Sequence, residues 1–600
     1  MTDPNSTLPH WDMSVVYPGL ESAEFETGFR SVIGAINRLG ELFDQHGIAK
    51  RQPAPLDEAT VQAFETVVRA MNAVLEEMRT VNAYVNSFVS TDSRNNLAQA
   101  RQSELQQNAV RLTMLGTRLT AWIGSLDVEA LIARSALGRE HAFMLRKAKI
   151  EAAHQMSPAE EELATEMRLT GATAWQKLHG NFTSQLSVKV ELDGKVQELP
   201  MSVVRNLASD PNREVRRRAY EAEIAAWRSA AVPLAAALNS IKGATNLLSK
   251  RRRWESPLEA SLFENNIDRQ TLEAMMAAAQ ESFPDFRRYL RAKARALGLP
   301  VLAWYDIAAP LGSGERAWGF DEGAQFIVEQ FGTYSLKLRG LAERAFGERW
   351  IDAEPRLGKR DGAFCMSLRQ DESRVFTNFK PTFGGVSTVA HELGHAYHNL
   401  NLAPRTMLQR QTPMTLAETA SIFCQTLVNQ AALRQAEAQE QILILEGALQ
   451  NACQVVVDIA SRFLFEQRVL EKRQQRELSI DEFNDLMLQA QRETYGDGLD
   501  SSVLHPYMWA VKPHYYSSTF YNYPYMFGLL FGLGLYARYQ DDPAGFQAGY
   551  DDLLSSTGLG NAAELAARFG IDTRAPDFWR SSLDVIRADI ARFESLVGRQ

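Results

Sequence analysis

The stretch HELGHAYH, residues 391–398, decides how this chain of 600 residues is interpreted. It places His391 and His395 four residues apart, with Glu392 between them. On an α-helix, residues at i and i+4 lie one above the other on the same face. Two imidazoles in this arrangement can bind one zinc ion, and the intervening carboxylate can reach a water on that ion. The pattern therefore predicts a helix that carries two metal ligands and a general base.

The sequence around this motif favours a helix from about residue 387 to residue 400. Ser387 or Thr388 is a suitable N-cap after a pair of glycines. Gly394 costs about 1 kcal/mol relative to alanine in a helix, but it allows another segment to approach closely. The chain contains 10 histidines. A chain of this length and composition is expected to contain only about 0.01 HExxH matches by chance.

A third ligand is needed, because a catalytic zinc site has three protein ligands and one open position. Glu418 follows His395 by 23 residues and lies in an apolar helical stretch, residues 413–433. A buried carboxylate requires a partner, and a metal is a suitable one. However, Thr415 and Glu418 also form a T-x-x-E capping box, in which Glu418 would only satisfy the start of a helix. Spacing alone leaves both interpretations open.

Other candidate metal ligands are weaker. His398 lies three residues after His395, which is not the spacing of zincins with three histidine ligands, so a packing role is favoured. The chain has three cysteines, Cys365, Cys424 and Cys453, and no CxxC pair. This usage argues against a cysteine-ligated metal and indicates a reducing compartment.

Charge and hydropathy exclude several classes of partner. The net charge is −9 and no long basic block occurs, so nucleic acid is not an expected partner. The first 13 residues lack the pattern of a signal peptide. The most apolar late run, residues 525–536, is shorter than the roughly 20 residues that span a bilayer and is expected to be a buried helix. We therefore expect a cytoplasmic protein without membrane contact; the oligomeric state is not predicted.

Helical periodicity dominates the first third of the chain. Residues 24–46, 57–88 and 95–135 carry apolar residues at helical spacing, and Ser157 begins an S-x-x-E capping box. We expect an N-terminal helical lobe over residues 1–183.

Two β segments interrupt the helical pattern. Residues 184–202 alternate polar and apolar side chains around Asp193-Gly194, which predicts a β-hairpin. Residues 350–386 contain three short apolar stretches, which predict a small sheet beside the motif helix. Its last strand, RVFTNF, either supports that helix or forms an edge that pairs with an extended peptide. The segment 299–311 is expected to be a strand or a buried loop. The fold class is thus mostly α, with residues 184–600 forming the catalytic region.

Several segments together resemble a known family. HELGHAYH, LAETAS at 416–421 and HYYSSTFYNYPY at 514–525 are similar to the thimet-oligopeptidase-like zinc metallopeptidases and their oligoendopeptidase F group. LPHWDMSVVYPGLESAEFE at 8–26 and WYDIAAP at 304–310 extend the resemblance over most of the chain.

This resemblance implies a mostly α-helical, two-lobed shell around a deep substrate channel, one zinc ion per chain, and endopeptidase activity on short peptides. It implies that His391, His395 and Glu418 bind zinc and that Glu392 is the general base. It also implies that the C-terminal aromatic segment stabilises the tetrahedral intermediate, through residues that map onto His514, Tyr516 and Tyr523. Tyr521 of the same segment and His505, which precedes the aromatic residues just upstream of it, are alternatives.

Two other functions remain open at this point. One is a helical HExxH carboxypeptidase or dipeptidase that trims peptide ends; it would need a cation for the terminal carboxylate, and the sequence does not single one out. The other is a zinc-stabilised peptide-binding protein without turnover. Glu392 argues against the second, because a structural zinc site has no use for a general base.

Overall fold

The chain forms two units, each built from segments that are far apart in the sequence. The computed structural model describes residues 8–192, 194–312 and 316–598. Unit 1 comprises Met1–Gln155, Arg316–Ala431 and Arg538–Leu565, and unit 2 comprises Met156–Glu315, Ala432–Ala537 and Ala566–Gln600. The predicted boundary at residue 183 does not separate these units, because a boundary based on chain order cannot divide interleaved segments.

The described part of the chain is mostly helical with two small sheets, as predicted. Unit 1 contains the following elements: α1 (Ala23–Gln45), α2 (Glu58–Thr91), α3 (Asn96–Gly124), α4 (Val128–Arg134), α5 (Ala136–Glu140), α6 (Ala142–His154), α13 (Phe320–Tyr334), α14 (Leu336–Gly347), β3 (Ile351–Asp352), β4 (Phe364–Arg369), β5 (Glu372–Phe376), α15 (Phe383–Leu402), α16 (Met414–Ala417), most of α17 (Thr419–Gln435), α24 (Pro543–Ser555) and most of α25 (Ala562–Ala567).

The first helices begin where side chains can cap them. Ser22, Asp57 and Asn95 each accept a hydrogen bond from the backbone N–H three residues later. Such caps satisfy N–H groups that have no partner within the helix. The three predicted helical stretches are therefore confirmed, although the last one ends at Gly124 and is followed by the separate helix α4.

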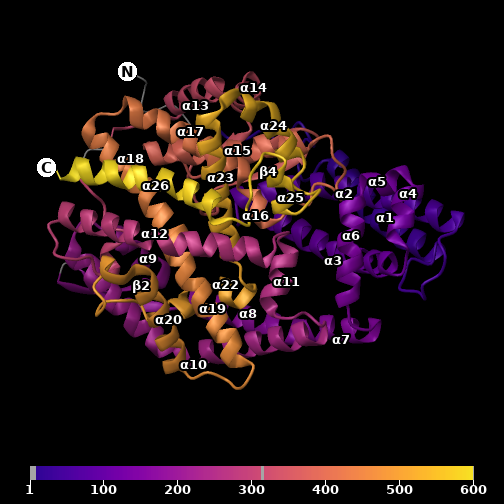
Figure 1. Ribbon diagram of the computed structural model, residues 1–600, viewed down its shortest axis with the longest axis horizontal. Helices are drawn as coiled ribbons and strands as arrows, with labels where there is room; N and C mark the ends of the chain where they lie inside the picture. The colour runs from indigo at the N-terminus through magenta and orange to yellow at the C-terminus, as the bar shows by residue number, and fades with distance from the viewer. Residues whose placement is uncertain (1–7, 193, 313–315, 599–600) are drawn as a thin grey trace. The chain divides into compact units, whose positions relative to one another are not determined.

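A three-stranded sheet lies against the motif helix in unit 1. Its strand order is β3-β5-β4, with β5 antiparallel to β4 and parallel to β3. Both β4 and β5 pack against α15, and the β4 label lies beside the α15 label in Figure 1. The predicted small sheet is confirmed. The idea that RVFTNF forms an edge is wrong, because β5 is paired on both sides; β3 and β4 are the outer strands.

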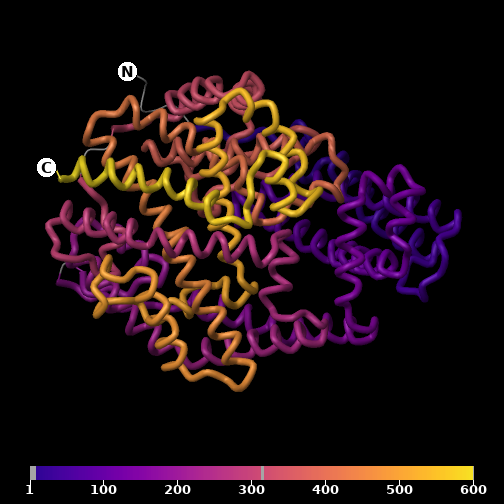
Figure 2. Tube along the Cα trace, in the orientation of Figure 1, coloured from indigo at the N-terminus to yellow at the C-terminus, as the bar shows by residue number. Residues whose placement is uncertain are grey.

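Unit 2 contains the remaining helices and the hairpin. Its elements are α7 (Pro158–Thr170), α8 (Ala172–Ser184), β1 (Ser187–Leu192), β2 (Lys195–Pro200), α9 (Met201–Asn206), η1 (Leu207–Ser209), α10 (Arg213–Arg251), α11 (Pro257–Glu264), α12 (Arg269–Ala296), η2 (Trp304–Asp306), α18 (Ala438–Cys453), η3 (Gln454–Asp458), α19 (Ile459–Arg473), α20 (Ile480–Tyr495), η4 (Gly496–Gly498), α21 (Met508–Val511), α22 (His514–Ser517), α23 (Tyr523–Asp541) and α26 (Pro576–Val597). In Figure 2 the C-terminal α26 runs beside α12, its main packing partner.

The local predictions for unit 2 hold in most places. The capping box at Ser157 is present, and β1 pairs antiparallel with β2. The predicted turn of this hairpin is Asp193-Gly194. Gly194 has a positive φ of 74°, a conformation that glycine adopts easily, and Asp193 lies outside the described residues. The segment 299–311 is a mostly buried loop with one isolated bridge from Leu302 and the short turn η2.

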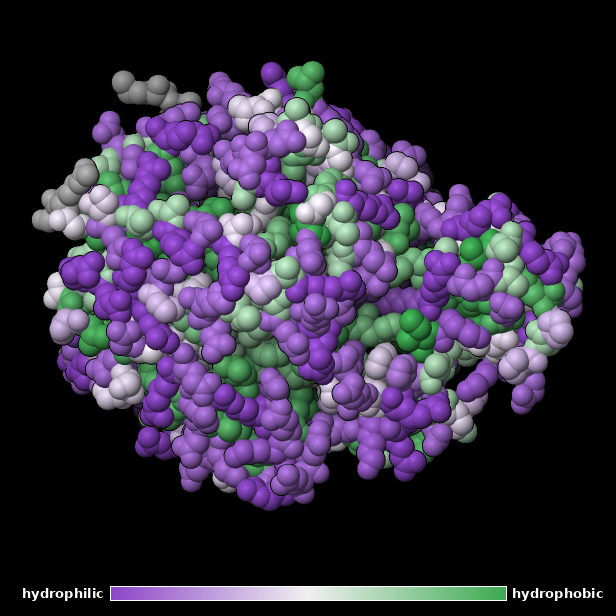
Figure 3. Space-filling view, viewed as in Figure 1, coloured by the Kyte–Doolittle hydropathy of each residue, from purple (hydrophilic) through white to green (hydrophobic). Residues whose placement is uncertain are grey.

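One helical stretch among the described residues, Ala438–Arg473, is long and apolar enough to cross a bilayer by length and composition. In the most apolar 18-residue window of this stretch, 61% of the window is buried inside the protein. The core helix of a globular protein is buried in the same way. The predicted helix at residues 525–536 also forms, as part of α23, and most of it is buried. Hydrophilic residues cover most of the face seen in Figure 3.

Candidate active site

Three of the predicted metal ligands come together in unit 1. His391 and His395 lie on α15, and Glu418 lies between α16 and α17. Their ligand atoms are all within 4.8 Å of one another. The two imidazole rings are perpendicular, with centroids 5.0 Å apart and an interplanar angle of 83°. Within the described residues, no other set of three or more histidine, cysteine or acidic side chains converges in this way.

The spacing of these atoms fits a tetrahedral divalent ion such as zinc. Glu418 Oε2 lies 3.3 Å from His391 Nε2 and 3.4 Å from His395 Nε2. Tetrahedral zinc with ligands at about 2.1 Å separates its donor atoms by about 3.4 Å. Two imidazoles and one carboxylate are also a typical catalytic donor set, with a fourth position left for water or substrate.

The capping interpretation of Glu418 is not supported by the backbone. The N-cap of α16 is Pro413, which has no side-chain cap, and Glu418 follows the last residue of that helix. The Glu418 carboxylate instead accepts a hydrogen bond from Ser421 Oγ at 2.5 Å. Burial opposes ionisation of Glu418, but hydrogen bonding to His391 and the charges of both histidines hold its pKa at about 2. The carboxylate is therefore anionic and faces the two imidazoles.

The motif helix begins earlier than predicted. Its N-cap is Thr382, whose side chain accepts a hydrogen bond from the backbone N–H of Gly385. Both glycines thus belong to the first turn, and the predicted caps Ser387 and Thr388 lie inside the helix. A Cβ on Gly385 would lie 2.2 Å from the carbonyl oxygen of Lys380. Glycine at this position allows the backbone to turn tightly into the first turn of the helix. The predicted helix start was too late because the two glycines were expected to precede the helix.

Gly394 lets α17 approach the histidine pair. A Cβ at this position would lie 2.5 Å from Ser421 Cα and 2.7 Å from the carbonyl oxygen of Ala420. The predicted close approach of another segment is confirmed. Because Glu418 immediately precedes α17, this contact sets the distance between the third ligand and the first two.

We expect Gly394→Ala to destabilise the protein and to weaken metal binding. The added methyl group would meet backbone atoms, and overpacking of this kind costs about 1–3 kcal/mol, more than the roughly 1 kcal/mol that alanine gains in a helix. Thermal unfolding and a zinc titration measure both effects. Gly340→Ala in α14 is the matched control, because its Cβ would meet nothing within 4 Å. Equal effects of the two substitutions would contradict the packing role of Gly394.

A chain of amide and hydroxyl groups orients His391. Its Nδ1 donates to Gln425 Oε1 at 3.1 Å, Gln425 Nε2 donates to Ser387 Oγ at 3.1 Å, and Ser387 Oγ donates to Asn429 Oδ1 at 2.8 Å. With Nδ1 held by Gln425, Nε2 is the ring nitrogen that faces Glu418 and that can bind a metal once it has lost its proton. Groups that fix the tautomer of a histidine ligand commonly tune metal affinity.

Sequence reasoning missed Gln425, although a signal for it exists. Gln425 follows Glu418 by seven residues, and this spacing places two side chains on the same face when the segment is helical.

Glu392 is buried next to His391 on the motif helix. Its side chain is 5% exposed, and its Oε2 has no hydrogen-bond partner within the described residues. Burial, aided by the negative charge of Glu418, raises the pKa of Glu392 to about 7 in spite of the opposing effect of His391. A carboxyl group with this pKa can accept and return a proton near neutral pH.

His398 packs inside unit 1 and does not join the cluster. It is 4% exposed, and its Nε2 lies 2.9 Å from Thr557 Oγ1. Burial lowers its pKa to about 4. The packing role predicted for His398 is consistent with this position.

The predicted residues of the C-terminal aromatic segment lie in unit 2, where the two tyrosines are buried. Tyr516 is 2% exposed, stacks on His179 with a centroid distance of 3.9 Å, and donates a hydrogen bond to the Leu234 carbonyl. Tyr523 is fully buried and donates to the Ser261 carbonyl at 3.1 Å. Both hydroxyl groups therefore have partners in the core of unit 2.

His514 and the alternative Tyr521 are more accessible. Their rings stack with a centroid distance of 4.5 Å and an interplanar angle of 10°. The Tyr521 hydroxyl is exposed and lies 2.8 Å from that of Tyr525. The other alternative, His505, is 1% exposed. Among the predicted residues and their alternatives, His514 and Tyr521 are thus the less buried ones.

Comparison with protein families agrees with the geometry of the metal cluster. Residues 333–585 match the model of peptidase family M3, and residues 123–187 match a model described as oligopeptidase F. Together these segments cover more than half of the chain and contain all three clustered ligands. The chain belongs to peptidase family M3. This M3 peptidase is a metallo-oligopeptidase.

Relatives and solved structures extend the likeness over nearly the whole M3 peptidase. An oligoendopeptidase F homolog of Lactococcus lactis is 22% identical, with 98% of this chain and 97% of the relative covered. Oligopeptidase PepF of Bacillus subtilis is 21% identical over 74% of this chain and 68% of its own. The fold matches that of a Chlamydophila abortus protein (TM-score 0.82, 20% identity, 98% of both chains). It also matches oligoendopeptidase-F of Enterococcus faecium (TM-score 0.69, 15% identity, 96% and 99% of the chains).

Proposed function

We propose that this M3 peptidase is a zinc-dependent endopeptidase that hydrolyses internal bonds of short oligopeptides. The observation that carries the proposal is the separation of 3.3 and 3.4 Å between Glu418 Oε2 and the two histidine Nε2 atoms, with the buried Glu392 beside them. The three unpaired cysteines support a reducing, cytoplasmic location.

In this proposal, His391, His395 and Glu418 hold the zinc ion. Zinc, when bound, supplies Lewis acidity that polarises a peptide carbonyl and acidifies a water. Glu392 accepts a proton from the attacking water, which becomes the nucleophile toward the carbonyl carbon. Glu392 then returns that proton to the leaving amine nitrogen, so the carboxylate is regenerated in each cycle. Gln425 keeps His391 in the tautomer whose Nε2 is free to bind.

Internally quenched peptides of increasing length, blocked at both ends, test this function. We expect cleavage at internal bonds, loss of activity after treatment with a chelator, and recovery when zinc is added in stoichiometric amount. A carboxypeptidase or dipeptidase would leave blocked peptides intact. A peptide-binding protein would retain zinc and release no fragments. Cleavage that persists in the metal-free protein would overturn the proposal.

His514 and one tyrosine of the aromatic segment are proposed to donate hydrogen bonds to the developing oxyanion. This role comes from the family resemblance, and accessibility now ranks Tyr521 ahead of Tyr516 and Tyr523. Donors of this kind contribute about 10²–10³-fold to kcat.

Three matched Tyr→Phe substitutions separate these candidates. We expect Tyr521→Phe to lower kcat by about 10²-fold with little change in KM, because a hydrogen bond made in the transition state is lost. Tyr516→Phe and Tyr523→Phe should each mainly cost about 1 kcal/mol of stability, because each removes a buried hydrogen bond. Steady-state kinetics and thermal unfolding of all three variants measure this. A large fall in kcat for Tyr523→Phe alone would instead support Tyr523, one of the two tyrosines implied by the family resemblance, as the hydrogen-bond donor.

A further inference from the structure

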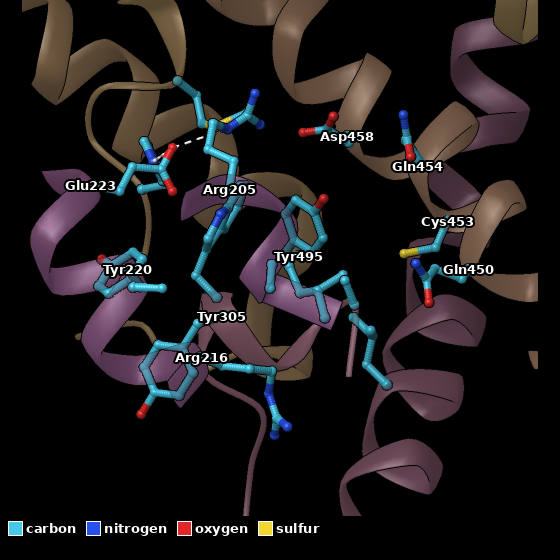
Figure 4. A pocket seen from close by; sticks show the side chains of 18 of the residues that line it. Arg205, Arg216, Tyr220, Glu223, Tyr305, Gln450, Cys453, Gln454, Asp458 and Tyr495 are labelled. Carbon is cyan, nitrogen blue, oxygen red and sulfur yellow. Dashed lines mark ion pairs between the residues drawn. The ribbon is translucent and has the colours of Figure 1, made fainter. Parts of the chain in front are cut away.

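Unit 2 contains a cavity that the peptidase chemistry does not use. Its volume is about 200 Å³, and all the residues that line it belong to unit 2. Residues of α9, α10, α12, the segment 304–308, the α18–α19 region, α20 and the segment 505–512 contribute to the lining. Figure 4 shows Glu223 and Arg205 on one side, with Asp458 and Gln454 on the other and Tyr495 between them. Arg205 and Gln454 are exposed and mark its opening.

The lining carries more positive than negative charge. Four cations, Arg205, Arg216, Arg462 and Lys512, face the cavity together with His505, whereas only Glu223 and Asp458 contribute carboxylates. Arg216 is paired with Asp306. Lys512 forms no ion pair within the described part of the chain, and burial together with the charge of Arg462 lowers its pKa to about 8.

The acceptors at the cavity already have donors. Glu223 accepts hydrogen bonds from Trp227 Nε1 at 3.0 Å and pairs with Arg205 Nε at 3.1 Å. Asp458 is paired with Arg462 Nη2. The negative side of the lining is therefore satisfied by the protein itself.

Several donors, in contrast, lack acceptors. His505 is 1% exposed, and neither ring nitrogen has a well-formed hydrogen bond within the described residues; its Nε2 lies 3.5 Å from Glu223 Oε1, at the distance of an ion pair when the ring is protonated. Arg462 is 6% exposed and Arg216 is 2% exposed, and the Nε atom of each is also without a partner there. Unpaired buried donors cost about 1–3 kcal/mol each, so proteins rarely keep them without a reason.

The backbone at the cavity is also unusual. Gln454–Asp458 forms one turn of π-helix, η3, between α18 and α19. Such π-turns inside α-helices are rare and occur frequently at functional sites. Both ends of this turn, Gln454 and Asp458, line the cavity, and Arg462 follows one helical turn later.

We propose that this cavity binds a small oxyanion, either inorganic phosphate or a short carboxylate, through Lys512, Arg462 and His505. The cavity lining supplies positive charge and buried hydrogen-bond donors that have no acceptor. A small oxyanion could accept hydrogen bonds from these donors. A volume of about 200 Å³ accommodates such an ion with a few waters, each of which takes about 30 Å³. This binding is independent of the proposed peptidase mechanism, because none of the lining residues belongs to the metal cluster.

Isothermal titration calorimetry of the full-length, zinc-loaded protein tests the proposal, with inorganic phosphate and succinate as separate probes in a chloride buffer of matched ionic strength. We expect saturable binding of at least one probe with one site per chain. Lys512→Met should weaken this binding at least about tenfold, since it removes a charged hydrogen-bond donor. Lys177→Met is the control, because Lys177 is an exposed lysine of unit 2 outside the cavity lining.

A second variant, His505→Gln, tests a buried part of the site and should also weaken binding; circular dichroism verifies that each variant is folded. Binding of phosphate alone or of succinate alone identifies the oxyanion, and either result supports the proposal. Absence of saturable binding of both probes would overturn it. Equal affinities of Lys512→Met and Lys177→Met would also overturn it, because binding would then lie elsewhere.

Discussion

Glu392→Gln is expected to lower kcat for a blocked peptide by about 10³-fold while zinc content stays the same. Glutamine retains the shape of the side chain but cannot accept the proton of the attacking water, and general bases contribute about 10²–10⁴-fold to rate. The side chain is not one of the three clustered ligands, so the metal should remain bound. Steady-state kinetics together with metal analysis by mass spectrometry measure both quantities.

Glu41→Gln provides the matched control, because Glu41 is an exposed glutamate of α1 in the same unit. It should retain the kcat and the zinc content of the unmodified protein. If Glu392→Gln kept more than about a tenth of the original kcat, Glu392 would not be the general base.

Glu418→Ala is expected to weaken zinc binding by more than about 100-fold and to abolish peptidase activity. Loss of a residue that only orients a ligand already costs 10–100-fold in metal affinity, and Glu418 is proposed as a ligand itself. Two histidines would remain, each with its Nε2 aimed at the space that the carboxylate leaves. Competition with a chromophoric zinc chelator measures the affinity.

Glu41→Ala serves as the control for this substitution and should bind zinc like the unmodified protein. Unchanged zinc affinity in Glu418→Ala would remove Glu418 from the ligand set. Excess zinc provides a further check, because high zinc concentrations should restore part of the binding but little of the activity. Full recovery of activity would indicate that another group completes the site.

Much of the candidate site could be predicted because its signals are local. His391, Glu392 and His395 lie within five residues, and the helical period alone brings the two histidines to one face. Glu418 required the family resemblance, since its spacing also fitted a capping box. In the structure Glu418 follows the last residue of α16 and faces both histidines, which favours the ligand interpretation through contacts that the sequence does not display.

The parts that sequence reasoning missed depend on distant residues. β5 is central because β3 and β4 pair with it from both sides, and strand order is not encoded in the strand itself. Gln425 is recognisable as an orienting group only once α17 lies against α15. The boundaries of the two units escaped prediction because each unit combines early, middle and late segments.

The late segment of unit 1 has a consequence for the biosynthesis of the enzyme. Tyr397 on the motif helix donates a hydrogen bond to Asp551, and His398 contacts Thr557. A growing polypeptide folds as its residues leave the ribosome, and contacts between distant residues form only when the later partner has emerged. The motif helix therefore gains these packing partners only after residues 551–557 have emerged from the ribosome. A ribosome-bound nascent chain, and any product truncated before residue 540, should consequently lack a mature catalytic centre.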